Sequence, residues 1–173
     1  MGQATFHHLP EIKQFTIENG LSQTRVNINF IDSRGFLWIG TSDGLNRYDG
    51  YTFKVYRHKP LDSLSISNNF IHSIDEDRKG NIWIGTNSGL NRFDPHTGKF
   101  HDYNEIWEDS MGIGNKIKSV YCERNGIIWI LTDGFLVRMQ SGSLRFKVSN
   151  YFLSTGSDFP VDANTNLVKD RNG

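Results

Sequence analysis

Gly35-Phe-Leu-Trp38-Ile-Gly-Thr41 returns as Gly80-Asn-Ile-Trp83-Ile-Gly-Thr86 and again as Gly126-Ile-Ile-Trp129-Ile-Leu-Thr132. The tryptophans lie 45 (83 − 38) and 46 (129 − 83) residues apart, and an arginine follows each of them nine positions later. A period of this length indicates a repeat protein in which each unit is one supersecondary module. This repeat decides the fold.

Each unit carries the pattern of four short strands. Between the tryptophan and the arginine the chain reads apolar run, threonine, turn and second apolar run, which is typical of a hairpin (Leu37–Ile39, Ser42–Gly44 and Leu45 in the first unit). An alternating segment that ends in an acid precedes the hairpin, from Val26 to Asp32, and an aromatic segment follows it, from Tyr51 to Tyr56. A four-stranded antiparallel unit of about 45 residues has the size of a β-propeller blade.

Other repeat architectures fit less well. Helix-pair repeats need amphipathic stretches with a 3.6-residue period, and no such stretch exceeds about two turns. Trp38 and Trp83 are followed by Ile-Gly and not by Asp, so the Trp-Asp repeat is excluded, and the double glycine of kelch repeats is missing.

The register of the repeat predicts an all-β chain that forms a partial β-propeller of about three and a half four-stranded antiparallel blades. We expect an N-terminal outer strand and lead-in at 1–20, blade 1 at 21–60, blade 2 at 61–105, blade 3 at 106–152 and the start of a fourth blade at 153–173. The lead-in contains Ile12–Ile17, which is interpreted as a strand. Because propellers close with about four to eight blades, we expect the chain to be part of a longer propeller.

The first unit in full reads Val26-x5-Asp32-x2-Gly35-x-Leu-Trp-Ile-Gly-Thr-x2-Gly44-Leu-Asn-Arg-Tyr-Asp-Gly50. This pattern resembles the two-component regulator propeller repeat, whose copies form the extracytoplasmic sensor of bacterial hybrid two-component systems. The resemblance implies a propeller fold, a sensing role, a histidine kinase elsewhere in the parent protein and a periplasmic location. Related propellers also occur in lyases.

Composition agrees with an ordered globular protein, because hydrophobic residues (36%) and 17 glycines in 173 residues together make up roughly 46% of the chain. The formal net charge is +0 and the basic residues do not cluster, which argues against a nucleic-acid partner. No apolar run approaches the roughly 18 residues that cross a bilayer, and Met1–His8 lacks the features of a signal peptide. We therefore expect no membrane insertion by this segment. Cys122 has no partner for a disulfide, and we expect it to be a small buried side chain.

Residues that recur in every unit are expected to be scaffold. The tryptophans offer flat surfaces that can pack between blades, with the indole N–H free for a backbone acceptor. Gly44 and Gly89 suit the positive φ of a tight hairpin. The acids before the glycine turns can accept turn N–H groups, and the arginines are expected to pair with these acids. The recurring acids and arginines are Asp32, Asp77, Glu123, Asp170, Arg47, Arg92 and Arg138.

Residues that depart from the repeat are candidates for a binding site. In a propeller, the loop from one blade leads to the inner strand of the next blade, and it arrives at the end where the middle hairpin turn also lies. In this chain these loops are long and dissimilar, which is typical of segments that carry function. Trp107, the only tryptophan out of register, suits a sugar ring or anchors its loop. Asn29 replaces an aliphatic inner-strand residue and is expected to be a satisfied buried amide. The predicted ligand-binding residues are Arg25, Asn68, Asn69, Trp107, Asn115, Lys116 and Phe135.

We expect no catalytic residues, no metal and no cofactor in this chain. The six histidines have no metal-ligand spacing, and no nucleophile elbow or phosphate loop is present. The expected function is ligand sensing, with a carbohydrate as the ligand and the signal relayed to a histidine kinase. The alternatives are a fragment of a propeller lyase or glycan-processing enzyme, and a protein-interaction propeller. The expected partners are a small-molecule or oligosaccharide ligand, the remaining propeller blades and further copies of the chain.

Overall fold

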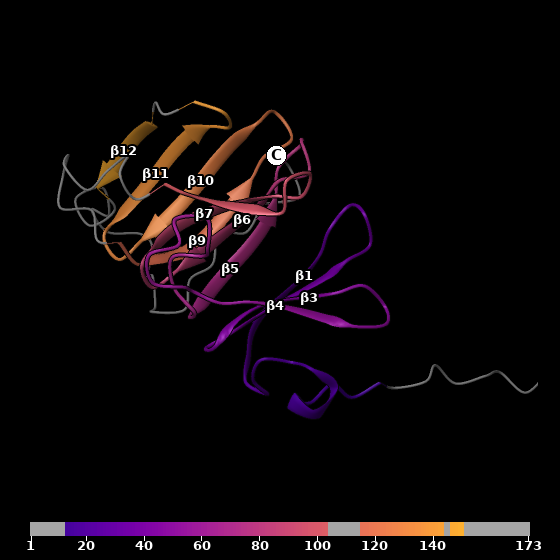
Figure 1. Cartoon of the computed structure of the whole chain (residues 1–173). Helices are drawn as coiled ribbons and strands as arrows, with labels where there is room; N and C mark the ends of the chain where they lie inside the picture. The colour runs from indigo at the N-terminus through magenta and orange to yellow at the C-terminus, as the bar shows by residue number, and fades with distance from the viewer. Residues whose placement is uncertain (1–12, 104–114, 144–145, 151–173) are drawn as a thin grey trace, which may run out of the picture.

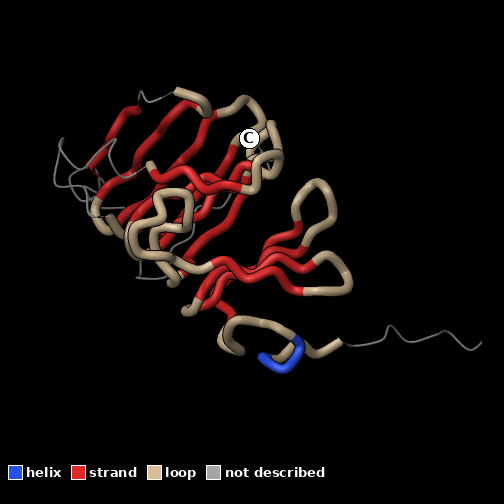
Figure 2. The backbone as a smooth tube through the Cα atoms, in the orientation of Figure 1, coloured by secondary structure: helices blue, strands red, loops and turns tan. Residues whose placement is uncertain are grey.

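A computed structural model describes residues 13–103, 115–143 and 146–150, with the backbone alone at 149 and 150. Three four-stranded antiparallel sheets follow one another along the chain, and each has its strands in sequence order from one edge to the other (Figures 1 and 2). The strands are β1(Val26–Ile31), β2(Leu37–Thr41), β3(Gly44–Tyr48) and β4(Phe53–Tyr56) in blade 1, β5(Ile71–Glu76), β6(Ile82–Thr86), β7(Gly89–Asp94) and β8(Lys99–Asp102) in blade 2, and β9(Ile117–Cys122), β10(Ile127–Thr132), β11(Phe135–Gln140) and β12(Phe146–Asn150) in blade 3. The predicted all-β partial propeller is confirmed.

The tryptophan lies on the second strand of every blade. Trp38 pairs with Arg47, Trp83 with Arg92 and Trp129 with Arg138, so the nine-residue spacing seen in the sequence is a cross-strand pair of the central hairpin. The hairpin glycines Gly44 and Gly89 have φ of 126° and 124°, which explains why glycine stands there.

Trp38 and Trp83 each pack against the blade that follows them. Trp38 of blade 1 belongs to a core cluster whose other members include Ile71, Ile84 and Phe93 of blade 2. In the same way Trp83 of blade 2 belongs to a cluster made largely of blade 3. Both indoles are fully buried, whereas Trp129 is half-buried. The expected packing of tryptophan between blades is confirmed.

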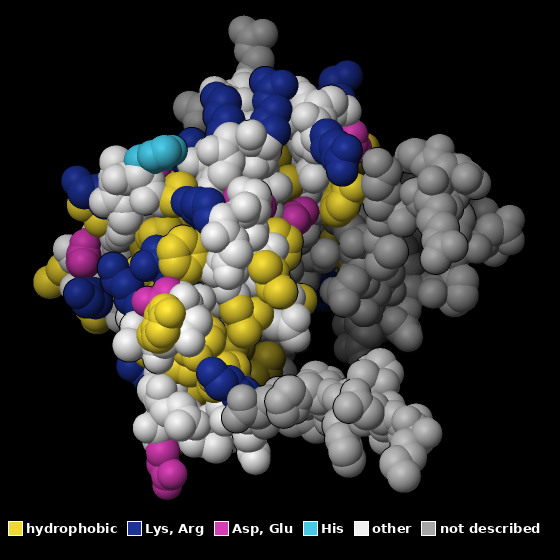
Figure 3. Space-filling model, turned by 90° about the vertical axis from the view of Figure 1, so that its right-hand side faces the viewer, with side chains coloured by type: hydrophobic (Ala, Val, Ile, Leu, Met, Phe, Trp, Pro, Cys, Tyr) yellow, Lys and Arg dark blue, Asp and Glu magenta, His cyan; other side chains and the backbone are white. Residues whose placement is uncertain are grey.

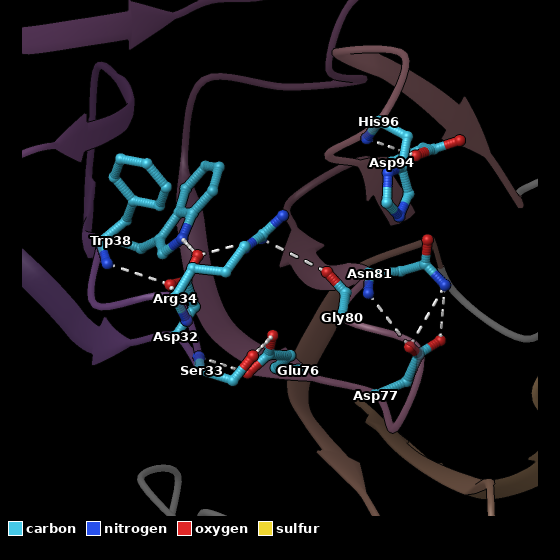
Figure 4. A network of polar contacts seen from close by, with 11 residues as sticks. Asp32, Ser33, Arg34, Trp38, Glu76, Asp77, Gly80, Asn81, Asp94 and His96 are labelled. Carbon is cyan, nitrogen blue, oxygen red and sulfur yellow. Dashed lines mark hydrogen bonds and ion pairs between the residues drawn. The ribbon is translucent and has the colours of Figure 1, made fainter.

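The indole N–H of each blade donates to a carboxylate and not to the backbone acceptor that the sequence suggests. Trp38 Nε1 lies 2.8 Å from Asp32 Oδ2 (Figure 4). Trp83 Nε1 lies 3.0 Å from Asp77 Oδ2. Trp129 Nε1 donates to Glu123 in the same register. The acids also accept turn N–H groups as predicted, because Asp32 Oδ1 takes those of Arg34 and Phe36 at 3.0 Å each. Each acid therefore joins its turn to the tryptophan six residues later.

The prediction that the arginines pair with these acids is wrong. The Arg47 guanidinium lies over the Phe36 ring at 4.5 Å from its centroid. Arg92 lies over the Tyr103 ring and Arg138 over the Trp129 ring, both at 5.9 Å. The acids are already occupied by turn N–H groups and the indole, and the cross-strand pairing places each arginine beside an aromatic ring.

Two other expectations fail in the N-terminal part. Residues 13–16 have no regular structure, and Ile17–Asn19 form a 3-10 helix where a strand was predicted. Asn19 Oδ1 accepts the Thr16 N–H at 2.9 Å, and Gly20 ends the turn with φ of 100°, so local capping competes with the strand. Asn29 is exposed and not a buried amide, because no described blade covers the outer side of β1, which is the side that points away from blade 2. Cys122 is half-buried and packs against the core that blade 3 shares with blade 2.

Candidate functional site

A β-bulge interrupts the first strand of every blade at the same register. In blade 1 the pairing of β1 with β2 skips from Val26 to Ile28, and in blade 2 the pairing of β5 with β6 skips from Ile71 to Ser73. In blade 3 the pairing of β9 with β10 skips Lys118. Bulges redirect a side chain and are frequent beside functional sites. The residues at the bulges are Asn27, His72 and Lys118, which we call the bulge ring.

In blades 2 and 3 the bulge residue reaches the hairpin turn of its own blade. His72 Nε2 lies 2.6 Å from Oδ1 of Asn87 in the turn between β6 and β7. Lys118 Nζ forms an ion pair of 2.9 Å with Oδ1 of Asp133 in the turn between β10 and β11. These contacts place the inner strands and hairpin turns at one end of the propeller, as the sequence predicts.

The polar groups of blades 2 and 3 lie close enough to influence one another. The pKa of Asp133 lies below its ordinary value, although partial burial acts to raise it. The hydrogen bond from Lys118 lowers the pKa most, and the charges of Lys118, Lys116 and His72 add to this effect. The Phe70 ring lies beside His72 at a centroid distance of 4.7 Å and adds an apolar surface. This end of the propeller therefore combines charged groups, amides and an aromatic ring.

Blade 1 presents different chemistry at the same positions. Asn27 Nδ2 donates to the carbonyl oxygen of Ile71 at 3.0 Å, so the first bulge residue joins blade 1 to blade 2. In the same blade, Arg57 forms an exposed ion pair of 3.0 Å with Asp43 of the hairpin turn. From blade 1 to blade 3 the bulge position thus changes from an amide to an imidazole to an ammonium group. These groups can exchange hydrogen bonds with a polar ligand, and no metal-holding cluster of His, Cys, Asp and Glu occurs among the described residues.

Two predicted site residues, Asn68 and Asn69, form hydrogen bonds within the loop before β5 and to the hairpin turn. Asn68 Nδ2 donates to Ser88 Oγ at 2.9 Å, and its Oδ1 accepts the Phe70 N–H at 2.8 Å. Asn69 Oδ1 accepts the His58 N–H at 2.7 Å. Asn68 therefore fixes the loop to the hairpin turn of blade 2, whereas Asn69 joins the end of the loop to His58 near its start.

The remaining predicted residues occupy varied places. Arg25 is exposed directly before β1, and Asn115 and Lys116 are half-buried directly before β9. Phe135 is the first residue of β11 and packs against the core shared by blades 2 and 3. Trp107 lies outside the described residues. The structure thus brings Lys116 to the charged end of blade 3, while Phe135 contributes to packing.

The bulge ring is the part of the site that sequence reasoning missed. Asn27, His72 and Lys118 directly follow an apolar residue at the start of the inner strand, where simple alternation gives no reason to single them out. The available signal is that these equivalent positions differ in chemistry, as do Ser42, Asn87 and Asp133 in the turns, while the surrounding scaffold stays constant.

The fold and its repeat define a β-propeller, and comparison with known proteins identifies the repeat. Residues 65–88 match the family model of the two-component regulator propeller, which confirms the resemblance seen in the sequence. The matched residues run from the loop before β5 to the hairpin turn after β6 of blade 2.

Solved structures from B. thetaiotaomicron share this architecture. The extracellular domain of a protein described as a hybrid two component system is 28% identical, with a TM-score of 0.70 over 80% of this chain and 20% of that one. A second extracellular domain with the same description is also 28% identical, with a TM-score of 0.59 over 69% of this chain and 17% of that one.

A curated relative extends the comparison. Histidine kinase P4 of Formosa agariphila is 56% identical over 55 residues, which are 32% of this chain and 4% of the relative. The chain thus spans only a small part of the proteins that it matches. Among residues 13–103, 115–143 and 146–150, no helix is both long and apolar enough to cross a membrane.

Proposed function

We propose that this chain is part of the ligand-sensing propeller of a bacterial hybrid two-component regulator. The observation that carries the proposal is the similarity to two extracellular domains of such systems, at 28% identity, together with the match to the two-component regulator propeller. The similarity to a histidine kinase supports a kinase elsewhere in the parent protein as the receiver of the signal. The propeller then lies outside the cytoplasmic membrane, in the periplasm, and the remaining blades belong to the same parent chain.

The bulge ring and its hairpin turns are the proposed ligand face. A residue that repeats in every blade serves what every blade needs, whereas the bulge position changes from Asn27 to His72 to Lys118. The proposed ligand is a carbohydrate, because a sugar offers hydroxyl groups to the amide, imidazole and charged groups and an apolar C–H face to an aromatic ring such as Phe70.

The test uses the full-length parent protein and measures both its melting temperature and its kinase response to candidate oligosaccharides. We expect His72→Ala and Lys118→Ala to weaken the response at least about 10-fold, which corresponds to about 1.4 kcal/mol of binding free energy. The melting temperature should change little, because both side chains are partly exposed. Lys99→Ala, an exposed lysine on the outer strand β8, is the matched control and should respond normally. Normal responses of both bulge variants would show that the ligand binds elsewhere in the parent protein.

A further inference from the structure

An open cavity lies at the rim of blade 2 and shares no residue with the bulge ring. It has a volume of about 510 Å³ and is lined by the loop that follows β4 and by the outer strand β8. Leu61, Leu64 and Phe100 supply apolar walls, and His58, Asp62 and His101 are among the polar residues that line it. Pockets for small ligands have volumes of about 300–1,000 Å³ and combine apolar walls with a few polar groups in this way.

The loop that forms the cavity has a defined internal structure. The Asp62 N–H donates to the Lys59 carbonyl at 3.1 Å, and the Ser65 N–H donates to the Asp62 carbonyl at 3.0 Å. Ser65 Oγ accepts the Lys59 N–H at 3.0 Å, and the Phe100 N–H donates to the Leu64 carbonyl at 3.3 Å, which attaches the loop to β8. The walls are therefore held in place before any ligand arrives, which lowers the entropic cost of binding.

Leu61 is an unusual residue for its position in this loop. Its φ is 68°, and no other described residue except glycine has a positive φ. The left-handed conformation is strained for a leucine, and the side chain is fully exposed (108%), so it gains no burial in return. Glycine or asparagine would fit the same backbone with less strain. Strained residues concentrate at ligand clamps, and here the strained leucine lies on the rim of a cavity.

The polar lining offers hydrogen-bond acceptors together with the donor Lys59. His58 Nδ1 lies 2.9 Å from the Ile66 carbonyl oxygen, which can only accept, so Nδ1 carries the proton and Nε2 of the neutral ring is an acceptor. The Asp62 carboxylate is a further acceptor. A sugar ring presents hydroxyl donors at its edge and C–H groups on its faces, which suit these acceptors and the leucine walls.

We propose that this cavity binds one pyranose ring of a saccharide and that Leu61 is kept in its strained conformation as the apolar wall of the pocket. The proposal does not depend on the bulge ring, because the two sets of residues are separate. A sensor with both sites would contact a saccharide at the channel end and at the rim of blade 2.

Saturation-transfer NMR on this chain tests the proposal, because the method tolerates self-association of the protein. The probes are glucose, galactose, N-acetylglucosamine and glucuronate, each with a matching disaccharide to separate single rings from chain ends. We expect at least one probe to receive saturation, and Leu61→Asn to reduce the effect several-fold while the melting temperature stays the same or rises. Tyr51→Asn, a highly exposed residue outside the cavity (91%), should leave the signal unchanged.

Four results would overturn the proposal. One is the absence of saturation transfer to every probe at about 20 mM, well above the millimolar range of weak binding. Another is an equal signal in the wild-type chain and in Leu61→Asn. The third is a Leu61→Asn variant whose average mass in light scattering is lower than that of the wild-type chain, while its saturation transfer to the sugars is unchanged. That result would identify the exposed leucine as a contact between protein chains. A loss of signal in His72→Ala alone would support the bulge ring and contradict the cavity.

Discussion

The pair of a buried carboxylate and an indole shows how one residue can serve a turn and a core together. Burial acts to raise the pKa of Asp77, but the hydrogen bonds from Asn81, Trp83 and the backbone outweigh it and lower the pKa below its ordinary value. The same balance lowers the pKa of Asp32. The sequence predicts the turn contacts of these acids. It does not predict the indole contact, which depends on how the turn folds back onto the second strand.

Asp75 is an acid in the opposite situation and provides a contrast. Burial raises its pKa, although it accepts the N–H groups of Cys122 at 2.6 Å and Glu76 at 2.8 Å, and the charge of Glu76 adds to the rise. An acid with a lowered folded-state pKa stabilises the fold above its unfolded pKa and loses this effect as pH falls through the folded value. An acid with a raised folded-state pKa stabilises the fold less as pH rises from its unfolded pKa to its folded pKa.

We predict opposite pH trends for Asp77→Asn and Asp75→Asn in urea unfolding between about pH 3 and pH 7. Asp77→Asn should lower the free energy of unfolding by about 1–3 kcal/mol at neutral pH, because it removes a charged hydrogen-bond acceptor from a buried site. The difference in the free energy of unfolding between Asp77→Asn and the wild type should shrink as pH falls below 3.8, the ordinary pKa of Asp. Asp75→Asn should gain stability relative to the wild type as pH rises above 3.8. Differences that stay constant with pH in both variants would contradict these assignments.

At the scale of the strand, a glycine on the second strand of a blade makes room for the inner strand of the next blade. A Cβ at Gly40 would lie 2.6 Å from Ile71 Cγ2, and one at Gly85 would lie 2.7 Å from Ile117 Cγ2 and 2.5 Å from Ser73 Oγ. In blade 3, Leu131 occupies the equivalent position and is 6% exposed. Blade 3 therefore presents a bulkier surface than blades 1 and 2 do at this point.

Gly85→Ala should lower the free energy of unfolding by about 1–3 kcal/mol through overpacking between blades 2 and 3. Ser73 Oγ is buried and has no hydrogen-bond partner among the described residues, so Ser73→Ala should cost little by itself. The double variant should then recover part of the loss, because one of the clashing atoms has gone. Equal costs of Gly85→Ala in both backgrounds, measured by urea unfolding, would show that Ser73 does not limit the space.

At this scale the sequence predicts the strands well and the exceptions poorly. The Gly-Trp-Thr spacing fixes the central hairpins because side-chain alternation and turn glycines agree there. The bulges at Asn27, His72 and Lys118 depend on pairing with a neighbouring strand, which a periodic pattern does not contain. For the same reason the sequence alone locates the candidate loops, whereas the bulge ring can be recognised only in the structure.

At the scale of the whole molecule, the three inner strands differ in burial although their sequences are equivalent. β5 and β9 have mostly buried or half-buried residues, whereas β1 exposes Val26 at 43% and Ile31 at 67%. Figure 3 shows hydrophobic side chains at the surface of this side of the molecule, with Lys and Arg spread around them and not gathered into one patch. The outer side of β1 therefore offers apolar surface to another blade or another chain.

The isolated chain should consequently associate with itself. In static light scattering its average mass should rise with concentration above the 19.8 kDa of one chain. Ile31→Lys should lower that mass at equal concentration, because a charge on an exposed strand opposes association. A mass of 19.8 kDa at every concentration would show that the exposed side of β1 is stable in water without a partner.

The burial of Trp38 and Trp83 by the following blade gives the propeller a direction in time as well as in space. As the chain emerges N-terminus first, blade 1 cannot enclose Trp38 until β5 and β6 of blade 2 have emerged, and Trp83 waits in the same way for blade 3. A propeller that folds while it emerges therefore folds one blade behind the emerging chain, and the tryptophan of its newest blade stays exposed to water in the meantime. A pause between two blades would keep that tryptophan exposed longest.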